Sequence, residues 1–522
     1  MSALIYKDRL LVHGPEAAAL NDLGVGDVID YKGKSITVVP HNEAACRVLW
    51  NACRLRVSAP IEQTFAFPGP FRPMPHQRAT AGFMTVHDRC FNLLDMGLGK
   101  TASCVWAAEY LLSKGRAKKI LVIAPLSCLR TVWETEIFTL TPTRRVAVVH
   151  GSKVKRKAAL ETDADYYVIN HDGIKLEESA LIKMGFDLVI VDEFTAFKTW
   201  NAARSKVAQR ITKNVGRLWM LSATPTPQSP EDAYFPTKIT SPSNVTTLTR
   251  FRARTMMQVN EHKWVPRADA VEYVGQVMQP SIRYEKTDVL KDLPAVMPPL
   301  RLEAQLTKDQ KRALRELEKE RVVMLGEGDK VAVRNAASVA LKMLQICQGI
   351  VIDEQSDVRQ LDRAGRSRTL LEALSYRKGK ALAFGAFRGV VENMAKDVAD
   401  DLGKDAVAMI HGGTGATRRE EIFKEFQDPT SKLQVIVAHP GTMSHGLTLT
   451  QADMIVWNGP APSREVFLQA NHRINRPGQK RVMQSVHIGS NFYEWKLFRV
   501  HQDGLDLQQT LLDLFKGKPL TS

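Results

Sequence analysis

The chain has few cysteines, and they are not arranged for disulfide or zinc chemistry. Only six occur in 522 residues, at positions 46, 53, 90, 104, 128 and 347, and no two form a C-x-x-C pair. This usage suits reduced thiols in a cytosol-like compartment. The sequence also lacks any run of about 18 apolar residues that could span a bilayer, and residues 1–8 lack the pattern of a signal peptide. We therefore expect a soluble, intracellular protein without a membrane partner.

Heptads and tandem repeats are also absent, which excludes coiled-coil and solenoid architectures. What remains is the composition of an ordinary globular protein, with 44% hydrophobic and 25% charged residues. The length allows several domains of ~150 residues each. The formal net charge of +16 favours a polyanionic partner such as nucleic acid.

Residues 95–101, with the sequence DMGLGKT, have the pattern of a phosphate-binding loop. Glycines let backbone N–H groups close around phosphates, and the lysine faces the β- and γ-phosphates. The threonine hydroxyl is placed to hold Mg²⁺, and the small, apolar residues that follow begin a helix whose N-terminus faces the anion. The predicted cofactor-binding residues here are Met96, Gly97, Leu98, Gly99, Lys100 and Thr101.

An acidic pair follows an apolar run further along the chain. Residues 186–191 read as a strand that is buried on both faces of a parallel sheet, and Asp192 and Glu193 then emerge at its carboxyl edge. With a phosphate loop upstream, Asp192 is the expected Mg²⁺ ligand and Glu193 the group that orients or deprotonates the attacking water. Without that loop, a pair that merely caps the next helix would be the better interpretation.

These motifs stand in an order that resembles the superfamily 2 nucleic-acid translocases. The order runs through FRPMPHQ at 71–77, the phosphate loop, IAPLS at 123–127, the acidic pair, and LSATP at 221–225. The string QANHRINRPGQ at 469–479 is similar to the closing motif of the Swi/Snf-like branch, whose members move along double-stranded DNA. Weaker matches lie at 280–294 and 344–348, so the resemblance covers roughly residues 70–500 and extends to phage and bacterial relatives.

The resemblance implies roles for residues outside the phosphate loop. Gln77 is similar to the residue that contacts adenine, which implies ATP as the nucleotide. Arg473 and Arg476 are implied to be arginine fingers that a second lobe supplies to the γ-phosphate, and Gln469 is implied to line the same cleft. Their spacing of three would place the arginines on one face of a helix. Ordinary surface salt bridges are the alternative interpretation.

DNA contacts are expected from loops at the same edge of both lobes, where hydroxyls and backbone N–H groups grip phosphates without reading sequence. The basic run 153–157 adds phosphate contacts or is merely a solvated loop; the sequence leaves both open. The candidate DNA-binding residues are Pro125, Ser127, Asn170, His411, Gly412, Thr442 and Ser444.

The fold class that follows is α/β, with two RecA-like parallel-sheet lobes in tandem and a small N-terminal α/β module. Residues 28–31 and 35–39 read as a hairpin of this module, and 42–56 as its helix. The module is a packing cap on the first lobe or contacts DNA or a protein partner. The expected divisions are 1–65 for the module, 66–240 for the first lobe, 241–300 for a protrusion and linker, 301–500 for the second lobe, and 501–522 for a tail.

The sequence thus predicts an ATP- and Mg²⁺-using, DNA-dependent ATPase that moves along double-stranded or branched DNA with little sequence preference. It is expected in the cytoplasm of a bacterium or a phage-infected cell. Two alternatives stay open: a strand-separating or branch-migrating helicase, and a non-hydrolysing nucleic-acid-binding scaffold. The scaffold is disfavoured because every expected ATPase residue is present. The pathway, polarity and oligomeric state cannot be predicted.

Overall fold

The computed structural model describes residues 3–22, 26–53, 55–260, 263–324, 329–352, 357–443 and 449–503. The chain divides into two units, Met1–Val289 and Leu290–Ser522. This division is coarser than the five segments expected from the sequence, and those boundaries stay a prediction. Of the helices in these ranges, none combines the length and apolar character that a bilayer crossing requires. All six cysteines are free thiols.

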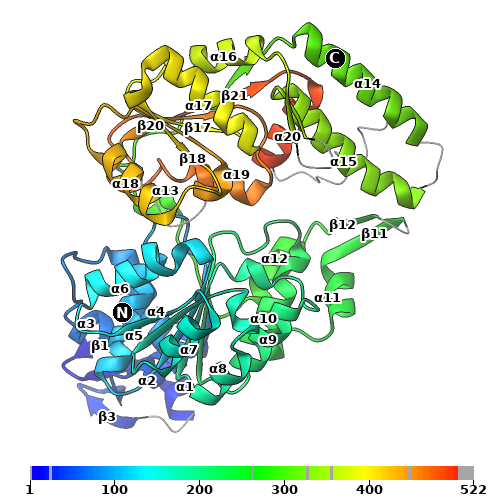
Figure 1. Cartoon of the computed structure of the whole chain (residues 1–522). Helices are drawn as coiled ribbons and strands as arrows, with labels where there is room; N and C mark the ends of the chain where they lie inside the picture. Colours follow the sequence, from blue (N-terminus) through cyan, green and yellow to red (C-terminus); the bar gives the residue numbers. More distant parts are fainter. Residues whose placement is uncertain are drawn as a thin grey trace. The chain divides into compact units, whose positions relative to one another are not determined.

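A small antiparallel sheet begins the first unit (Figure 1, dark blue). Its strands are ordered β1-β2-β4-β3, and Lys32 and Gly33 form the tight β3–β4 turn with positive φ angles of 55° and 74°. Asn42 caps the following helix through the N–H of Ala45, so the predicted hairpin and helix are both present, but the helix ends at Asn51 and not at residue 56. The elements are β1 (Ala3–Tyr6), β2 (Arg9–His13), α1 (Pro15–Asp22), β3 (Asp27–Tyr31), β4 (Lys34–Pro40) and α2 (Glu43–Asn51).

Within the described residues, seven parallel strands form the main sheet of the first unit, in the order β13-β5-β10-β9-β6-β8-β7. Strands β6 and β9 are buried throughout, as their nearly continuous apolar sequences predict. The strands are β5 (Arg89–Asn92), β6 (Ile120–Ala124), β7 (Val146–Val149), β8 (Tyr166–Asn170), β9 (Leu188–Asp192), β10 (Arg217–Leu221) and β13 (Ser281–Ile282).

Helices flank this sheet (Figure 1), and two segments differ from their predicted form. The basic run 153–157 begins α7 and is not a loop, and the expected linker at 241–300 contains helices, the hairpin of β11 (Met256–Asn260) and β12 (Lys263–Pro266), and β13, which joins the main sheet. The helices are α3 (Pro60–Thr64), α4 (Pro75–Val86), α5 (Lys100–Ser113), α6 (Thr135–Leu140), α7 (Lys153–Glu161), α8 (Glu178–Met184), α9 (Ala203–Thr212), α10 (Tyr234–Thr240), α11 (Leu248–Thr255), α12 (Ala270–Val277) and α13 (Lys286–Val289).

The second unit is built on another parallel sheet, ordered β14-β21-β20-β17-β19-β18 in the described part of the chain. Successive residues of β17 enter different core clusters, Leu382 on one side and Ala383 on the other. The sheet is therefore buried on both faces, which is the arrangement of a RecA-like lobe. Its strands are β14 (Leu300–Glu303), β17 (Lys380–Phe384), β18 (Val407–Ile410), β19 (Val435–Ala438), β20 (Ala452–Trp457) and β21 (Gln484–Gly489).

The strongly charged helix α14 packs against α15. The predicted fold class, two RecA-like lobes with a small N-terminal module, is confirmed. The other elements of the second unit are α14 (Lys308–Met324), α15 (Asp329–Cys347), β15 (Ile350–Ile352), β16 (Val358–Gln360), α16 (Ala364–Ser375), α17 (Arg388–Leu402), α18 (Ala416–Gln427), α19 (Arg464–Asn471) and α20 (Phe492–Asp503).

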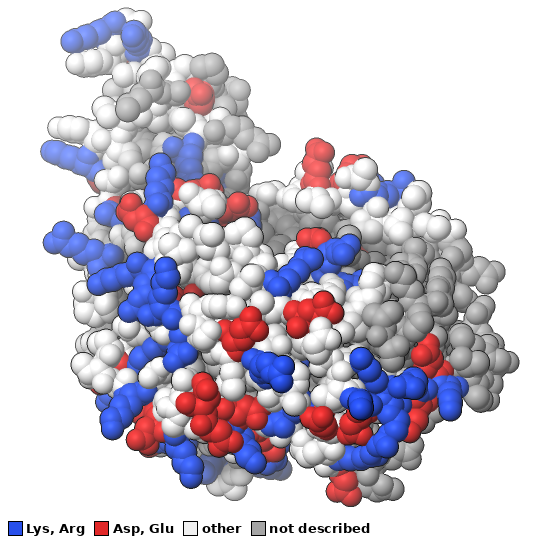
Figure 2. All heavy atoms as spheres, turned by 90° about the horizontal axis from the view of Figure 1, so that it is seen from above, with Lys and Arg blue, Asp and Glu red and all other residues white. Residues whose placement is uncertain are grey.

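Charge of both signs covers the face of the molecule seen in Figure 2, where Lys and Arg side chains are interspersed with Asp and Glu. The net charge of +16 is therefore not gathered into one broad positive area on that face. The positive charge that binds a polyanion must therefore lie locally, at particular loops and strands.

Candidate nucleotide-binding site

Parallel strands bring the first unit's motifs to one edge of its sheet. Leu221 pairs with both Asn92 and Asp192, so the ends of β5, β10 and β9 lie level with one another. The phosphate loop follows β5, the acidic pair ends β9, and Ser222 follows β10. The carboxyl edge of a parallel sheet is where ligands bind in open α/β folds. Strand register accounts for this convergence.

The phosphate loop has a backbone that glycine makes accessible. Gly97 and Gly99 have φ angles of 84° and 79°, in the left-handed region that other residues rarely adopt. A Cβ on Gly99 would lie 2.1 Å from the Gln77 amide nitrogen, so a larger residue would displace the Gln77 side chain from the loop. Gly99 precedes the first residue of α5 and offers no capping side chain. The N-terminus of a helix favours an anion, so the start of α5 suits a phosphate group.

Lys100 lies within its own loop. Its ammonium donates to the carbonyl oxygens of Leu94, at 2.9 Å, and Asp95, at 3.4 Å. Asp95 is held in turn by Arg283, at 3.1 Å, and by the N–H of Lys286, also at 3.1 Å. The segment after β13 thus fixes the start of the loop. A positive charge in a loop that exposes backbone N–H groups suits the phosphates of a nucleotide.

Gln77 joins α4 to the phosphate loop. Its amide oxygen accepts from the N–H of Met74 at 2.9 Å, and its amide nitrogen donates to the Leu98 carbonyl at 3.3 Å. The neighbouring His76 also contacts that carbonyl, at 3.0 Å, with its ring 96% buried. The expected adenine contact of Gln77 stays a prediction, whereas its contact with the loop is a direct observation.

Asp192 is a buried carboxylate at the end of β9, only 9% exposed. One carboxylate oxygen accepts from the indole N–H of Trp133 at 3.0 Å. Burial raises the pKa of Asp192, whereas the Trp133 hydrogen bond and the positive charge of Lys100 act in the opposite direction. Trp133 lies on a π-helical turn (Leu129–Glu134), and nothing in the sequence around it indicated this role.

Glu193 has the left-handed φ angle of 50°, which is uncommon for a residue with a side chain. Its carboxylate accepts from the Ser222 hydroxyl at 3.1 Å, and the N–H of Thr224 donates to the same hydroxyl at 3.1 Å. Segment 222–224 therefore contacts the predicted catalytic carboxylate directly.

His171, the residue that follows β8, contacts the same edge of the sheet. Its Nε2 lies 2.8 Å from the Asp192 carbonyl oxygen, and because a carbonyl only accepts, this nitrogen carries the proton. Burial lowers the pKa of His171 to about 4, so the ring is neutral near pH 7. The residue thus fixes the backbone of the acidic pair.

ATP and Mg²⁺ fit the residues that this edge provides. The loop offers backbone N–H groups and an ammonium, and the donor set of Thr101 hydroxyl and Asp192 carboxylate has the hard oxygen atoms that Mg²⁺ prefers. Among the described residues, no three His, Cys, Asp or Glu side chains form a metal cluster of their own.

The predicted arginine fingers belong to the second unit and do not lie on a helix. Helix α19 ends at Asn471, so Arg473 and Arg476 come from the turn that follows it, which corrects the predicted helical placement. Arg473 is 3% exposed, and Arg476 is only partly buried. Gln469 is also 3% exposed and donates to Glu465 at 3.2 Å. Arg476 is therefore the more accessible of the two.

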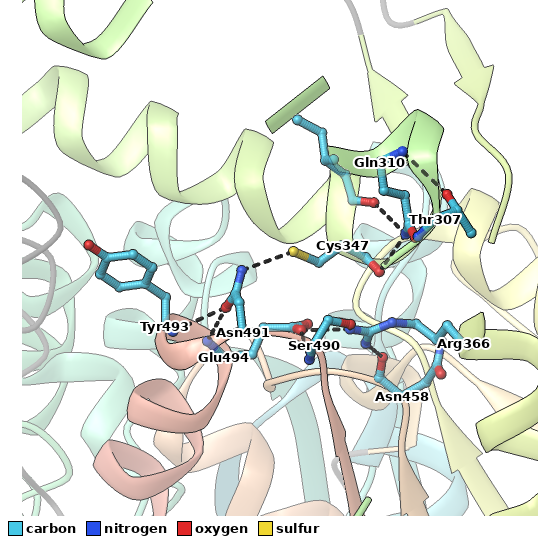
Figure 3. A network of polar contacts seen from close by, with 10 residues as sticks. Thr307, Gln310, Cys347, Arg366, Asn458, Ser490, Asn491, Tyr493 and Glu494 are labelled. Atoms are coloured by element: carbon cyan, nitrogen blue, oxygen red, sulfur yellow. Dashed lines mark hydrogen bonds and ion pairs between the residues drawn. The ribbon is translucent and has the colours of Figure 1, made fainter. Parts of the chain in front are cut away.

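A buried polar network fixes the strand that leads into α19 (Figure 3). Arg366 donates to the Asn458 carbonyl at 2.5 Å, directly after β20, and pairs with Glu494 at 2.6 Å. Asn491 donates to the Cys347 sulfur at 3.2 Å and caps α20 through the N–H groups of residues 493 and 494. The Arg366 and Glu494 side chains are 3% and 0% exposed. These hydrogen bonds connect α15, α16, the end of β20 and α20 with one another.

The candidate DNA-binding residues also follow strand ends, separately in each unit. Ala124 pairs with Asn170 in the first sheet and Ile410 with Ala438 in the second, so neighbouring strands bring these loops together in pairs. Ser127 and Gly412 are exposed, Asn170, His411 and Thr442 are partly buried, and Pro125 is buried where it begins a 3₁₀ turn. Ser444 lies outside the described residues.

Known families match most of the chain. The model of the SNF2-related domain matches residues 76–354, and that of the helicase conserved C-terminal domain matches 356–478. The Xenopus tropicalis SWI/SNF-related matrix-associated actin-dependent regulator of chromatin subfamily A-like protein 1 is 25% identical over 419 residues, 78% of this chain and 41% of that protein. The human DNA annealing helicase and endonuclease ZRANB3 is 23% identical over 409 residues, 75% of this chain and 36% of that protein.

A shorter match is to protein p41 of Acyrthosiphon pisum secondary endosymbiont phage 1, 31% identical over 177 residues, 31% of this chain and 38% of p41. Each of these matches spans about two fifths of its relative. The solved Sulfolobus solfataricus SWI2/SNF2 ATPase core in complex with dsDNA is 19% identical with a TM-score of 0.43, over 87% of this chain and 96% of that one. From the two matched domains, the chain belongs to the SNF2-related family of helicase-like ATPases.

Proposed function

We propose that this protein is a DNA-dependent ATPase that moves along double-stranded DNA and remodels DNA structures or DNA-bound proteins. The observation that carries the proposal is the meeting of the phosphate loop, Asp192, Glu193 and Ser222 at one sheet edge. Family membership supports ATP as the nucleotide, and a relative solved with dsDNA supports DNA as the partner.

The first unit binds the nucleotide in this proposal. Backbone N–H groups of residues 96–101 and the Lys100 ammonium hold the phosphates, and Gln77 contacts the adenine while it keeps the loop in place. Thr101 and Asp192 would hold Mg²⁺, which would supply positive charge to the phosphate oxygens. Glu193, which accepts a hydrogen bond from Ser222, accepts a proton from the attacking water or orients it.

The second unit supplies positive charge for hydrolysis. Phosphoryl transfer is mostly positioning and charge stabilisation, so an arginine that reaches the γ-phosphate raises the rate by ~10³–10⁵. We assign this role to Arg476 and, with it, Arg473, which follow α19; Gln469 lies within α19 and donates to Glu465. The polar network around Arg366 holds the end of β20 in place just before α19, and it thereby supports the turn that follows α19.

Duplex contacts come from loops at the strand ends. The Ser127 and Thr442 hydroxyls, the Asn170 amide, His411 and the backbone of Gly412 would hold phosphates, with Pro125 shaping its turn. Contacts of this kind carry no sequence information, so the motor works with little sequence preference. The phage relative p41 supports action in the cytoplasm of a bacterium or a phage-infected cell.

The test separates nucleotide binding from hydrolysis. Lys100→Ala should weaken nucleotide binding and abolish turnover, because it removes the positive charge that faces the phosphates. Glu193→Gln should bind ATP normally yet fail to hydrolyse it. The exposed Lys118→Ala and Glu161→Gln are matched controls that should leave turnover unchanged. Near-wild-type turnover in either site variant would refute the assignment of this site.

A further inference from the structure

The small N-terminal sheet is apolar on both faces, and only one face is covered. Leu10, Val12, Thr37 and Val39 point to the covered side and are 0% exposed. That side packs on α1, and α2 fastens the module to the first lobe through Trp50, whose ring stacks on Phe83 of α4 at 6.2 Å. The module lies before residue 76, where the SNF2-related match begins.

The opposite face of this sheet is open to solvent but is not polar. Cross-strand pairing places Leu4, Leu11 and Val38 in one row and Ile29 beside Ile36. Leu4 is 57% exposed and Ile29 42%. A solvated face of an antiparallel sheet normally carries polar residues, and a contiguous apolar face that stays exposed marks a binding surface.

Tyrosines occupy two opposite corners of this face. Tyr6 lies across from Arg9 and is 59% exposed; Tyr31 lies across from Lys34 and is 57% exposed. Three strand spacings of ~4.8 Å and six residues of ~3.4 Å along β4 place the two corners roughly 25 Å apart. A partner that uses both rings must therefore extend across the sheet.

Positive charge accompanies both rings. The Lys7 ammonium lies 5.6 Å from the centre of the Tyr6 ring, and the Lys32 ammonium 5.3 Å from that of Tyr31. Arg9 and Lys34 are exposed on the same face. Among the strand residues of this face, Asp27 is the acidic one. Asp8 lies in the β1–β2 turn, and Asp30 points to the other side and accepts from Gly33. The face is thus aromatic at its corners and positive overall.

We propose that this face binds single-stranded DNA, with the Tyr6 and Tyr31 rings stacking on bases and the four cations contacting phosphates. Exposed aromatic rings within a positive surface are the features that single-strand binders share, and four-stranded sheets serve RNA-binding modules in the same way. A protein partner would bind to the apolar centre of the sheet and would not require a lysine beside each corner tyrosine. The surface is distinct from the motor's duplex contacts, and it would direct the protein to junctions where single strands are exposed.

Affinity measurements on the full chain test the stacking. We expect the double variant Tyr6→Leu with Tyr31→Leu to bind a fluorescent oligo-dT at least about tenfold more weakly, since each lost stack is costly. Tyr6→Phe with Tyr31→Phe keeps both rings and should bind like wild type. Tyr376→Leu, at a tyrosine 47% exposed on the second unit, is the matched control and should have no effect. Because both target tyrosines are exposed, these changes spare the core.

A second measurement compares duplexes with and without a single-stranded tail. Wild type should prefer the tailed duplex, and the Leu double variant should bind both alike while its blunt-duplex-stimulated ATPase is unchanged. Photo-crosslinking to 5-iodouracil in the tail should map to residues 6 and 31. The proposal is overturned if the Leu variant keeps wild-type affinity, if crosslinks map only to the motor, or if single-stranded RNA binds more tightly than DNA. If blunt duplex DNA does not stimulate ATP hydrolysis by the wild-type protein, the proposed motor function is refuted instead.

Discussion

The hydrogen bond from Trp133 to Asp192 offers a sharp test of the metal-binding carboxylate. Tryptophan N–H only donates, and phenylalanine has no donor, so Trp133→Phe removes the 3.0 Å hydrogen bond from a buried carboxylate. A hydrogen bond to a charged group contributes ~1.5–3 kcal/mol. The same substitution at Trp219 is a matched control, because that indole is fully buried and its N–H has no partner among the described residues.

Both substitutions remove the same volume, so their difference isolates the hydrogen bond. Near pH 7 we expect the free energy of unfolding of Trp133→Phe to lie ~1.5–3 kcal/mol below that of Trp219→Phe. The lost bond favoured the ionised carboxylate, so the pKa of folded Asp192 rises further while that of the unfolded chain is unchanged. The extra destabilisation is therefore fully present above the folded pKa of Asp192 in the variant and disappears in acid, below the folded pKa of Asp192 in the wild type.

ATP turnover should show the same effect on its acid side. Mg²⁺ needs the ionised carboxylate, so the acid limb of the pH–rate profile moves to higher pH in Trp133→Phe and stays in place in Trp219→Phe. Turnover from about pH 5 to 9 at saturating Mg²⁺ and DNA, with urea unfolding at matched pH, measures both quantities. Coincident profiles and equal stabilities for the two variants would show that Trp133 does not act on Asp192.

Two further predictions concern the second unit. Arg476→Ala, and Arg473→Ala with it, should keep ATP and DNA binding and lose hydrolysis, as measured by nucleotide and DNA titrations beside turnover; collapse of all three activities would make these arginines structural. Glu494→Leu should lower the free energy of unfolding by ~3–5 kcal/mol, because it leaves Arg366 buried without its charge partner. The double variant Arg366→Leu with Glu494→Leu should recover much of that loss in urea unfolding, and no recovery would argue against the ion pair.

Long apolar runs and motif order were enough to predict the fold class. Strands such as β6 and β9 are buried on both faces, so their sequences are nearly continuous in apolar residues. Strand β5 carries no such signal because its four residues include Arg89 and Asn92, and β13 carries none because two residues show no periodicity. Both become strands through the neighbours they pair with, which a local pattern does not reveal.

The candidate site divides in a similar way. The phosphate loop and acidic pair have local patterns, whereas the Trp133–Asp192 hydrogen bond joins residues 59 positions apart and leaves no local trace. Arg473 and Arg476 were placed on a helix from their spacing alone, but α19 ends at Asn471. The exposed face of the N-terminal sheet was also not predicted, because which face α1 covers is decided by packing.

The rate of ATP hydrolysis with different nucleic acids tests the central claim most directly. Turnover would be measured without nucleic acid and with duplex, single-stranded, forked and four-way DNA and with RNA, each over a range of salt. We predict that duplex DNA of any sequence stimulates hydrolysis more than single strands or RNA, with an apparent affinity that falls steeply as salt rises, because phosphate contacts release counterions. Strongest stimulation by single strands or RNA would contradict duplex translocation, and a flat salt response would contradict backbone tracking.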